Sequence, residues 1–198
     1  MMKRLFDILI SLILLIILLP IMLFIAALVV FNFGLPILFK QMRPGYLGKP
    51  FVMYKFRTMH EKFCPNNELL SDNLRVTKFG LNLRSTSLDE LPTLWNVFIG
   101  NMTLVGPRPL LMEYLSLYDK KQARRHDVKP GITGWAQVNG RNSISWVDRF
   151  KLDIWYVDNC SFWLDLKIIF LTIKKVFLRE GITEYGEMTM SKFKGNKR

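Results

Sequence analysis

An apolar run from Ile8 to Phe33 constrains this chain more than any other feature of its sequence. Only Ser11, Pro20 and Asn32 interrupt the run. A helix of about 20 apolar residues is enough to cross the hydrocarbon core of a bilayer, and this run is longer. No small-residue cleavage site follows it, so a membrane helix fits better than a signal peptide.

Pro20 lies near the middle of the run, where its ring clashes with the preceding turn and one backbone hydrogen bond is lost. We therefore expect a kink at Pro20. The residues that carry positive charge on either side of the run are Lys3, Arg4, Lys40, Arg43 and Lys49. The positive-inside preference draws both flanks to the cytoplasm, which favours a bent helix that enters and returns. A tilted helix that crosses once is the open alternative, and the test is whether both ends lie on one side.

The 198 residues are enough for one domain with a core, and the formal net charge of +12 predicts an anionic partner. Nucleic acid, acidic lipid headgroups and phosphorylated small molecules all satisfy that charge. Cys64 and Cys160 lack the spacing of metal ligands, which indicates ordinary thiols in a reducing compartment. His60 and His126 are too few for a zinc site.

The remaining chain predicts an α/β fold, mostly helical with a small β-hairpin, over residues 36–198, with residues 1–35 as the membrane helix. Ile37–Phe39 and Phe51–Phe56 read as strands separated by Pro-Gly turn signals. The segment 129–134 reads as a Pro-Gly loop, and the polar tail from Thr183 is expected to fray or to lie on the surface.

A second apolar segment, from Phe162 to Leu178, is too short and too often charged to span a bilayer. Lys167, Lys174 and Lys175 in it fall at i, i+7 and i+8, on one side of a helix. An amphipathic helix in the membrane interface and a core helix with a basic outer face both fit this pattern.

Ser87 to Glu90 matches a capping box, with Ser87 as N-cap and Glu90 three residues later. The helix that it opens should run through the apolar residues up to Ile99 and end at Gly100. A helix N-terminus stabilises negative charge and would keep Asp89 ionised. Consecutive helical residues point about 100° apart, so Asp89 and Glu90 can take different roles, one attacking phosphorus and the other binding a metal ion. A routine cap without chemistry is the plainer alternative.

Basic residues supply the other half of a phosphate site. Lys55 and Arg57 alternate with aromatic residues in a predicted strand, Arg84 precedes the acidic pair, and Arg108 stands between two prolines. A rigidly held guanidinium binds phosphate through two hydrogen bonds, although single surface arginines are usually only solvated. The glycine-punctuated stretch 134–142 could receive a nucleotide or form a structural turn. Neither a Walker A loop nor a Gly-x-Gly-x-x-Gly fingerprint occurs.

Four blocks of sequence together carry a specific resemblance: 55–59 (KFRTM), 83–92 (LRSTSLDELP), 104–109 (LVGPRP) and 129–142 (KPGITGWAQVNGRN). In this order they resemble the bacterial sugar transferase family, in its small, monotopic phosphoglycosyl transferase form. The resemblance runs from the N-terminal helix to the tail. It is closest to members that transfer diacetylbacillosamine phosphate in protein glycosylation.

The resemblance implies a two-step reaction at Asp89. The aspartate attacks the β-phosphorus of a UDP-sugar, UMP leaves, and undecaprenyl phosphate then takes the phosphosugar. Glu90 would bind Mg²⁺ together with Asp89. The other positions that match the family's polar site are Lys55, Arg84, Arg108, Arg141 and Asp153.

The resemblance also implies a location at the bacterial inner membrane, with the catalytic domain on the cytoplasmic face and interfacial helices beside it. The family's re-entrant helix breaks at Ser-Pro, whereas this chain has Leu19 before Pro20. The expected partners are a UDP-sugar, undecaprenyl phosphate and membrane lipids, and no nucleic acid. The first alternative is the same reaction with another UDP-hexose or UDP-N-acetylhexosamine. A basic membrane adaptor without chemistry is the second.

Overall fold

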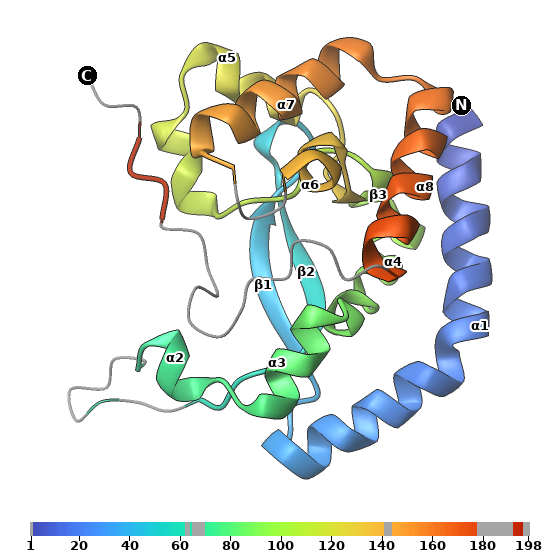
Figure 1. Cartoon of the computed structure of the whole chain (residues 1–198), viewed down its shortest axis with the longest axis vertical. Coiled ribbons are helices and arrows are strands. Elements are labelled where there is room, and N and C mark those ends of the chain that lie inside the picture. Colours follow the sequence, from blue (N-terminus) through green and yellow to red (C-terminus); the bar gives the residue numbers. More distant parts are fainter. Residues whose placement is uncertain (1, 62–63, 65–69, 141–143, 178–191, 196–198) are drawn as a thin grey trace.

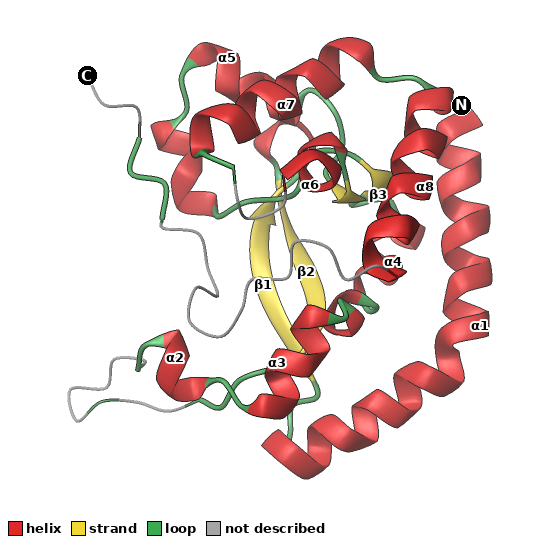
Figure 2. Cartoon of the chain, viewed as in Figure 1, coloured by secondary structure: helices red, strands yellow, loops and turns green. Residues whose placement is uncertain are grey.

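The computed structural model describes residues 2–61, 64, 70–140, 144–177 and 192–195. Its helices are α1 (Met2–Phe33), α2 (Asp72–Arg75), α3 (Lys78–Ser85), α4 (Thr93–Ile99), α5 (Lys120–Ala123), α6 (Trp135–Gly140), α7 (Trp146–Asn159) and α8 (Phe162–Phe177). The 3-10 turns are η1 (Tyr46–Gly48), η2 (Leu88–Glu90), η3 (Met112–Leu117) and η4 (Arg124–His126). The strands are β1 (Leu38–Pro44), β2 (Pro50–Phe56), β3 (Thr103–Val105) and β4 (Gly131–Thr133). Helices surround the long hairpin (Figures 1 and 2), so the predicted α/β fold, mostly helical with a small hairpin, is confirmed.

The hairpin pairs β1 and β2 in antiparallel register, from Leu38 opposite Phe56 to Pro44 opposite Pro50. The predicted hairpin is therefore confirmed, with a first strand that extends further than expected. Phe51, Met53 and Phe56 on β2 are buried in the core. The turn between the strands contains Leu47 in the left-handed region, with φ of 54°.

The second sheet pairs β3 and β4 in parallel, with Thr103 opposite Gly131 and Val105 opposite Thr133. The prediction of a loop over 129–134 is wrong for its central residues. Gly131 marks a close approach of two backbones and not a turn, because a Cβ there would lie 2.1 Å from the backbone nitrogen of Gly106. This pairing fixes the start of the segment that leads to Arg108.

Helix α1 bends midway and follows the side of the domain (Figure 1). Pro20 lies inside this helix, so the bend agrees with the predicted kink. Beyond the bend, Ile25, Val29 and Phe33 pack with Phe56 and Leu83. Among the described residues, α1 is the one helix long and apolar enough to cross a membrane. Whether it crosses or returns stays a prediction, as does the division between residues 1–35 and 36–198.

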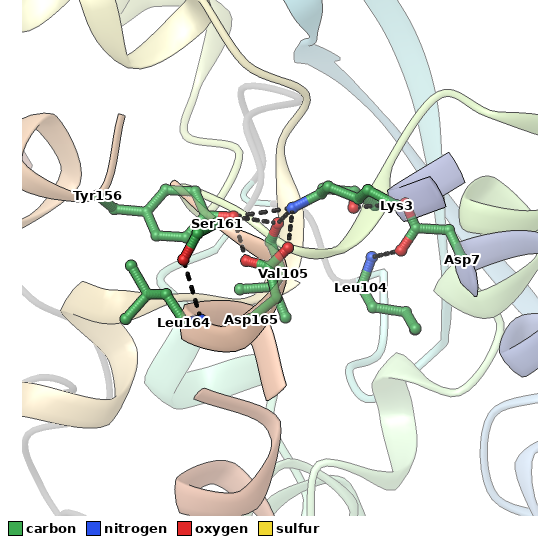
Figure 3. Close-up of polar contacts among 9 residues, drawn as sticks. Lys3, Asp7, Leu104, Val105, Tyr156, Ser161, Leu164 and Asp165 are labelled. Atoms are coloured by element: carbon green, nitrogen blue, oxygen red, sulfur yellow. Dashed lines mark hydrogen bonds and ion pairs between the residues drawn. The ribbon is translucent and has the colours of Figure 1, made fainter. Parts of the chain in front are cut away.

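The first turns of α1 are bound to the rest of the domain by polar contacts that are buried or partly buried (Figure 3). Asp7 accepts hydrogen bonds from the Thr103 hydroxyl at 2.7 Å and from the Leu104 backbone nitrogen at 3.0 Å. Lys3 donates to the Val105 carbonyl at 2.9 Å and pairs with Asp165 at 2.6 Å. These contacts tie α1 to β3 and to α8.

Arg4 binds the other side of the same body. Its two terminal nitrogens donate to the carbonyls of Val97 and Phe98 at 2.6 and 2.8 Å. Those carbonyls belong to the last turn of α4, where a cation is favourable. The positive charges at the start of the chain thus have protein partners in addition to any effect on orientation in the membrane.

Helix α8 confirms the predicted helix and combines features of both open alternatives. Ile168 is fully buried in the core, and Lys167 lies 5.7 Å from the Trp135 ring centroid. The helix also exposes large apolar side chains, as an interfacial helix requires. These residues are Trp163, Phe170 and Ile173, which are 78%, 67% and 51% exposed.

The expectation of a frayed or superficial tail is wrong for Phe193, whereas Lys192 and Lys194 on either side of it are exposed. Within 192–195, Phe193 is 7% exposed and packs against Tyr114 and Phe150. Composition alone did not reveal this, because one aromatic residue in a polar stretch gives no periodic signal.

Candidate active site

The acidic pair lies on a short turn that precedes α4, and not on the helix itself. Ser87 has a left-handed φ of 58° and makes no side-chain cap, and α4 begins at Thr93 after Pro92. The predicted capping box is therefore wrong. The Glu90 side chain contacts cations across the site instead of the Ser87 backbone. The predicted end of the helix at Gly100 is confirmed, with φ of 93°.

Glu90 is held by two cations from different parts of the fold. Arg108 donates from Nη1 to Glu90 Oε2 at 3.1 Å and from Nη2 to Oε1. Lys55, on β2, donates to Oε1 at 2.5 Å. Both oxygens of this carboxylate are therefore satisfied within the protein.

These contacts shift the ionisation of all three groups. Burial raises the pKa of Glu90, but the charges of Arg108 and Lys55 outweigh it and leave the pKa well below its usual range. Burial lowers the pKa of Lys55, an effect that Glu90 partly offsets. The charge of Glu90 raises the pKa of Arg108. Glu90 is thus a permanent anion at neutral pH.

Asp89 has a different environment although it is the next residue. It is 7% exposed and makes no hydrogen bond or ion pair with another described residue. Burial and the neighbouring charge of Glu90 raise its pKa to about 6, against the attraction of Lys55, Arg108 and Arg84. The expectation that a helix N-terminus favours the ionised form of Asp89 is wrong, because Asp89 lies on η2 and its surroundings raise its pKa above the usual value. With a pKa of about 6, Asp89 is still mostly ionised at neutral pH, and its oxygens have no partner among the residues that the structure describes.

Arg84 approaches the acidic pair from α3. Its Nε donates to the buried Thr58 hydroxyl at 3.1 Å. Thr77 caps the start of α3 by accepting from the Gly80 backbone nitrogen at 3.1 Å, which fixes the helix that carries Arg84. Arg84 also lies close enough to lower the pKa of Asp89. The structure therefore brings Lys55, Arg84 and Arg108 together around the acidic pair, as expected.

Asp153 contacts the site indirectly, through Arg125. It lies on α7 and forms a buried ion pair with Arg125, whose Nη2 is 2.7 Å from Asp153 Oδ2. The same Nη2 donates to the Arg108 carbonyl at 2.7 Å. Sequence reasoning missed Arg125, because it stands in a run of exposed-looking basic residues with no motif around it.

Another expected cation, Arg57, does not contribute to this arrangement. Arg57 faces the end of α1, where its Nη1 donates to the Leu35 carbonyl at 3.2 Å, and its Nε donates to the Met59 carbonyl at the same distance. It lies one residue beyond β2, so the alternation that placed Lys55 no longer applies to it. Arg141 lies outside the described residues.

Arg43 is a cation of the site that the sequence did not reveal. Its Nη2 donates to Gln41 Oε1 at 2.7 Å, and its buried Nε has no hydrogen-bond partner. Burial and the charge of Arg108 lower the pKa of Arg43 to about 10, while Glu90 raises it. The register places Arg43 opposite Phe51 and Phe39 opposite Lys55, so Arg43 and Lys55 share one face of the hairpin. The register of β1 and β2, had it been known, would have placed Arg43 on the same face as Lys55.

The carboxylates fit a magnesium ion that is held jointly with a phosphate ligand. No cluster of three or more His, Cys, Asp or Glu residues forms within the described ranges. Mg²⁺ usually binds one or two carboxylates together with substrate phosphates. Asp89 offers unengaged oxygens for this purpose, whereas those of Glu90 are bound to Arg108 and Lys55.

The fold and the site define a domain with an apolar N-terminal helix and a centre in which several cations surround two carboxylates. The chain belongs to the bacterial sugar transferase family, which it matches over residues 1–179. The predictions of this family and of a transferase enzyme are confirmed. The long apolar α1 agrees with a membrane protein.

Relatives cover most of the chain. It is 56% identical over 194 residues to the uncharacterized sugar transferase EpsL of Bacillus subtilis, covering 98% of this chain and 96% of that protein. It is 39% identical over 198 residues to the exopolysaccharide production protein ExoY of Rhizobium meliloti, covering 91% and 88%. It is 44% identical over 188 residues to the UDP-glucose:undecaprenyl-phosphate glucose-1-phosphate transferase of Klebsiella pneumoniae, covering 90% of this chain but 40% of that longer protein.

Proposed function

We propose that this chain transfers a sugar phosphate from a UDP-sugar to undecaprenyl phosphate through a covalent intermediate on Asp89. The names of relatives support the general reaction, including the Klebsiella glucose-1-phosphate transferase and the undecaprenyl-phosphate galactose phosphotransferase of Salmonella typhimurium, which is 38% identical over 196 residues. The observation that carries the proposal is the contrast between two adjacent carboxylates. Glu90 is fully engaged by cations, and Asp89 is buried among the same cations with free oxygens.

In the first step, an Asp89 oxygen attacks the β-phosphorus of the UDP-sugar. The bond from that phosphorus to the bridging oxygen breaks, and UMP leaves with the electron pair. In the second step, a phosphate oxygen of undecaprenyl phosphate attacks the same phosphorus and the Asp89 carboxylate leaves. Arg108, Lys55 and Arg43 offset the negative charge that gathers on the phosphoryl oxygens. The tail of the acceptor stays in lipid while its headgroup reaches the site.

Magnesium is proposed as the cofactor, held by Asp89 and Glu90 together with substrate phosphates. Bound there, it would neutralise diphosphate charge as a Lewis acid. A ligand set completed by the substrate predicts that Mg²⁺ binds more tightly in the presence of UDP-sugar. Calorimetry of Mg²⁺ binding to the wild-type chain, with and without a UDP-sugar analogue whose bridging oxygen is replaced by a methylene group, measures this coupling without turnover. Equal affinity in both titrations would contradict a shared site.

For the donor, the names of relatives favour a UDP-hexose over UDP-diacetylbacillosamine. Those that state a sugar state glucose or galactose. We therefore place the hexose donor ahead of the bacillosamine donor that the sequence blocks first implied. UMP release from UDP-glucose, UDP-galactose, UDP-N-acetylhexosamines and UDP-diacetylbacillosamine distinguishes these donors, and the one with the highest kcat/KM is the substrate.

We also propose that the catalytic domain faces the cytoplasm at the bacterial inner membrane. UDP-sugars are cytoplasmic metabolites, and the exposed apolar residues of α8 suit a surface that rests in the interface. In this arrangement α1 enters the membrane and returns.

The decisive experiment is to trap the phosphosugar on the protein. Wild-type chain incubated with donor and without acceptor should gain the mass of one phosphosugar, measured on the intact protein. Asp89→Asn should gain none, whereas Arg124→Gln, which removes an exposed cation, should behave like wild type. A basic adaptor without chemistry predicts no mass gain in any variant, and an Asp89→Asn variant that still turns over would refute the mechanism.

A further inference from the structure

Phe193, close to the C-terminus, is buried in a socket of aromatic side chains from η3 and α7. Its ring centroid lies 5.0 Å from that of Phe150, 5.6 Å from that of Trp146 and 5.7 Å from that of Tyr114. Its backbone nitrogen also donates to the Tyr114 hydroxyl at 3.1 Å. The side chain of Phe193 therefore belongs to the packed core of the protein.

The socket continues to the buried guanidinium of Arg125. Phe193 stacks on Tyr118, with ring centroids 6.1 Å apart. The Arg125 guanidinium carbon lies 5.9 Å from the ring centroids of both Tyr118 and Phe150, which is cation–π distance. Two of the four rings that contact Phe193, those of Tyr118 and Phe150, are thus also in contact with Arg125.

Arg125 in turn holds the backbone of a residue in the site. Its Nη2 donates to the Arg108 carbonyl and to Asp153 Oδ2, both at 2.7 Å, and its Nε donates to the same Asp153 oxygen at 3.1 Å. The Arg108 side chain binds both oxygens of Glu90. A continuous set of contacts therefore links Phe193 to the acidic pair through Tyr118, Arg125 and Arg108.

We infer that Phe193 is a positioning residue for the transferase site. It completes the aromatic socket that orients Arg125, and Arg125 sets the position of Arg108. Since small displacements of a catalytic group lower the rate much more than substrate binding, loss of Phe193 should affect kcat more than KM. A role confined to packing would lower stability and leave the kinetics of the folded fraction unchanged.

Three variants of this segment separate the two roles. Phe193→Ala empties the socket, Phe193→Leu keeps most of its volume, and Lys192→Ala removes only an exposed ion pair with Glu113. We expect Phe193→Ala to lower kcat for UMP release roughly tenfold, with KM changed less than about twofold. Phe193→Leu should recover much of the loss, and Lys192→Ala should match wild type. Wild-type kcat in folded Phe193→Ala would overturn the inference.

A double-mutant cycle tests the path through Arg125. If Phe193 acts through Arg125, the effects of Phe193→Ala and Arg125→Lys on kcat should be clearly less than additive in free energy. Additive effects would show that the two residues act separately and would overturn the proposed path.

Hydrogen exchange supplies a readout that does not depend on turnover. The segment 104–110 should exchange faster in Phe193→Ala than in wild type or Lys192→Ala, because Arg125 no longer holds the Arg108 carbonyl. Unchanged exchange in that segment would overturn the inference. The inference uses the proposed function only for its kinetic assay, so an inactive wild-type chain would count against the proposed reaction and leave the exchange test to decide the role of Phe193.

Discussion

Arg108 donates from two guanidinium nitrogens to the two carboxylate oxygens of Glu90. This fork geometry is specific to arginine, since a lysine ammonium offers a single point of contact. The pair occupies both oxygens of Glu90, whereas the oxygens of Asp89 have no partner among the described residues. The ion pair with Arg108 therefore helps to give the two adjacent carboxylates, Asp89 and Glu90, different environments.

Arg108→Lys should therefore lower kcat/KM for UMP release by about 10- to 100-fold, although it keeps the charge. The lysine loses one of the two hydrogen bonds and no longer fixes Glu90. Arg124→Lys is the matched control, because Arg124 forms an exposed pair with Asp158. Steady-state kinetics on both variants measures the difference, and equal activity would show that the fork is dispensable.

Arg43→Gln should weaken donor binding. The buried Nε of Arg43 has no partner among the described residues, so a phosphate oxygen is a suitable acceptor for it. We expect KM for the UDP-sugar to rise about tenfold, which corresponds to the loss of one charge-assisted hydrogen bond. Lys40→Gln on the same strand removes an equal charge at an exposed position and should leave KM unchanged. A KM shift shared by both variants would indicate a general field effect.

His126 should make the protein less stable in mild acid. Burial and the charge of Arg125 lower its pKa to about 4. Between the ordinary value of about 6.5 and that value, the unfolded chain binds a proton that the folded chain does not. Stability from this group is therefore complete above about pH 6.5 and is lost progressively as the pH falls toward 4, by about 3 kcal/mol in total.

The structural cause is local and can be removed. The Nδ1 of His126 lies 3.2 Å from the Gly45 carbonyl, and its buried Nε2 has no partner for a second proton. His126→Gln should flatten this part of the stability profile, measured as the thermal midpoint in detergent at several pH values. The quantity to compare is the difference between variant and wild type, because other groups titrate in both. A difference that does not change with pH would refute the assignment.

Asp7→Ala should destabilise the protein by about 1–3 kcal/mol, because it leaves the Thr103 hydroxyl and the Leu104 N–H buried without a partner. Asp7→Asn keeps one acceptor oxygen and should lose less. The shift of the thermal midpoint in detergent measures both. If both variants were as stable as wild type, the polar contacts of Asp7 would not contribute to stability as the structure indicates.

Pro20→Ala should straighten α1 and change its path in the membrane. Single cysteines placed at Met2 and Asn32, in a chain with Cys64 and Cys160 replaced by serine, report the side on which each end lies. With Pro20 present, a membrane-impermeant thiol reagent should label both from the cytoplasmic side. Without it, the ends should label from opposite sides. Opposite labelling in the presence of Pro20 would establish a helix that crosses once.

Local sequence patterns predicted much of the fold. Hydrophobic length predicted α1, strand composition predicted the hairpin, and Gly100 marked the end of α4, because each depends on neighbours along the chain. The parallel pairing of β3 with β4 was not predicted from the sequence, because it joins segments separated by more than twenty residues and each strand is very short.

The residues of the site also fall into two groups, those that local sequence patterns predict and those that depend on the tertiary structure. Lys55, Arg84 and Arg108 could be chosen from the sequence because they stand in recognisable blocks around the acidic pair. Arg43 and Arg125 depend on strand register and on burial of a guanidinium against aromatic rings, which no local pattern reports. The capping box at Ser87 failed because the cations that bind Glu90 come from distant segments, and their attraction outweighs a local cap.

The hydrogen bonds of Lys3, Arg4 and Asp7 limit how this enzyme can be engineered. A soluble version cut at the end of α1 would strip partners from β3 and from the last turn of α4, and so would a chimera with a foreign anchor. A redesigned anchor should therefore begin after Ser11, so that the first turns of α1 keep their hydrogen bonds to the domain.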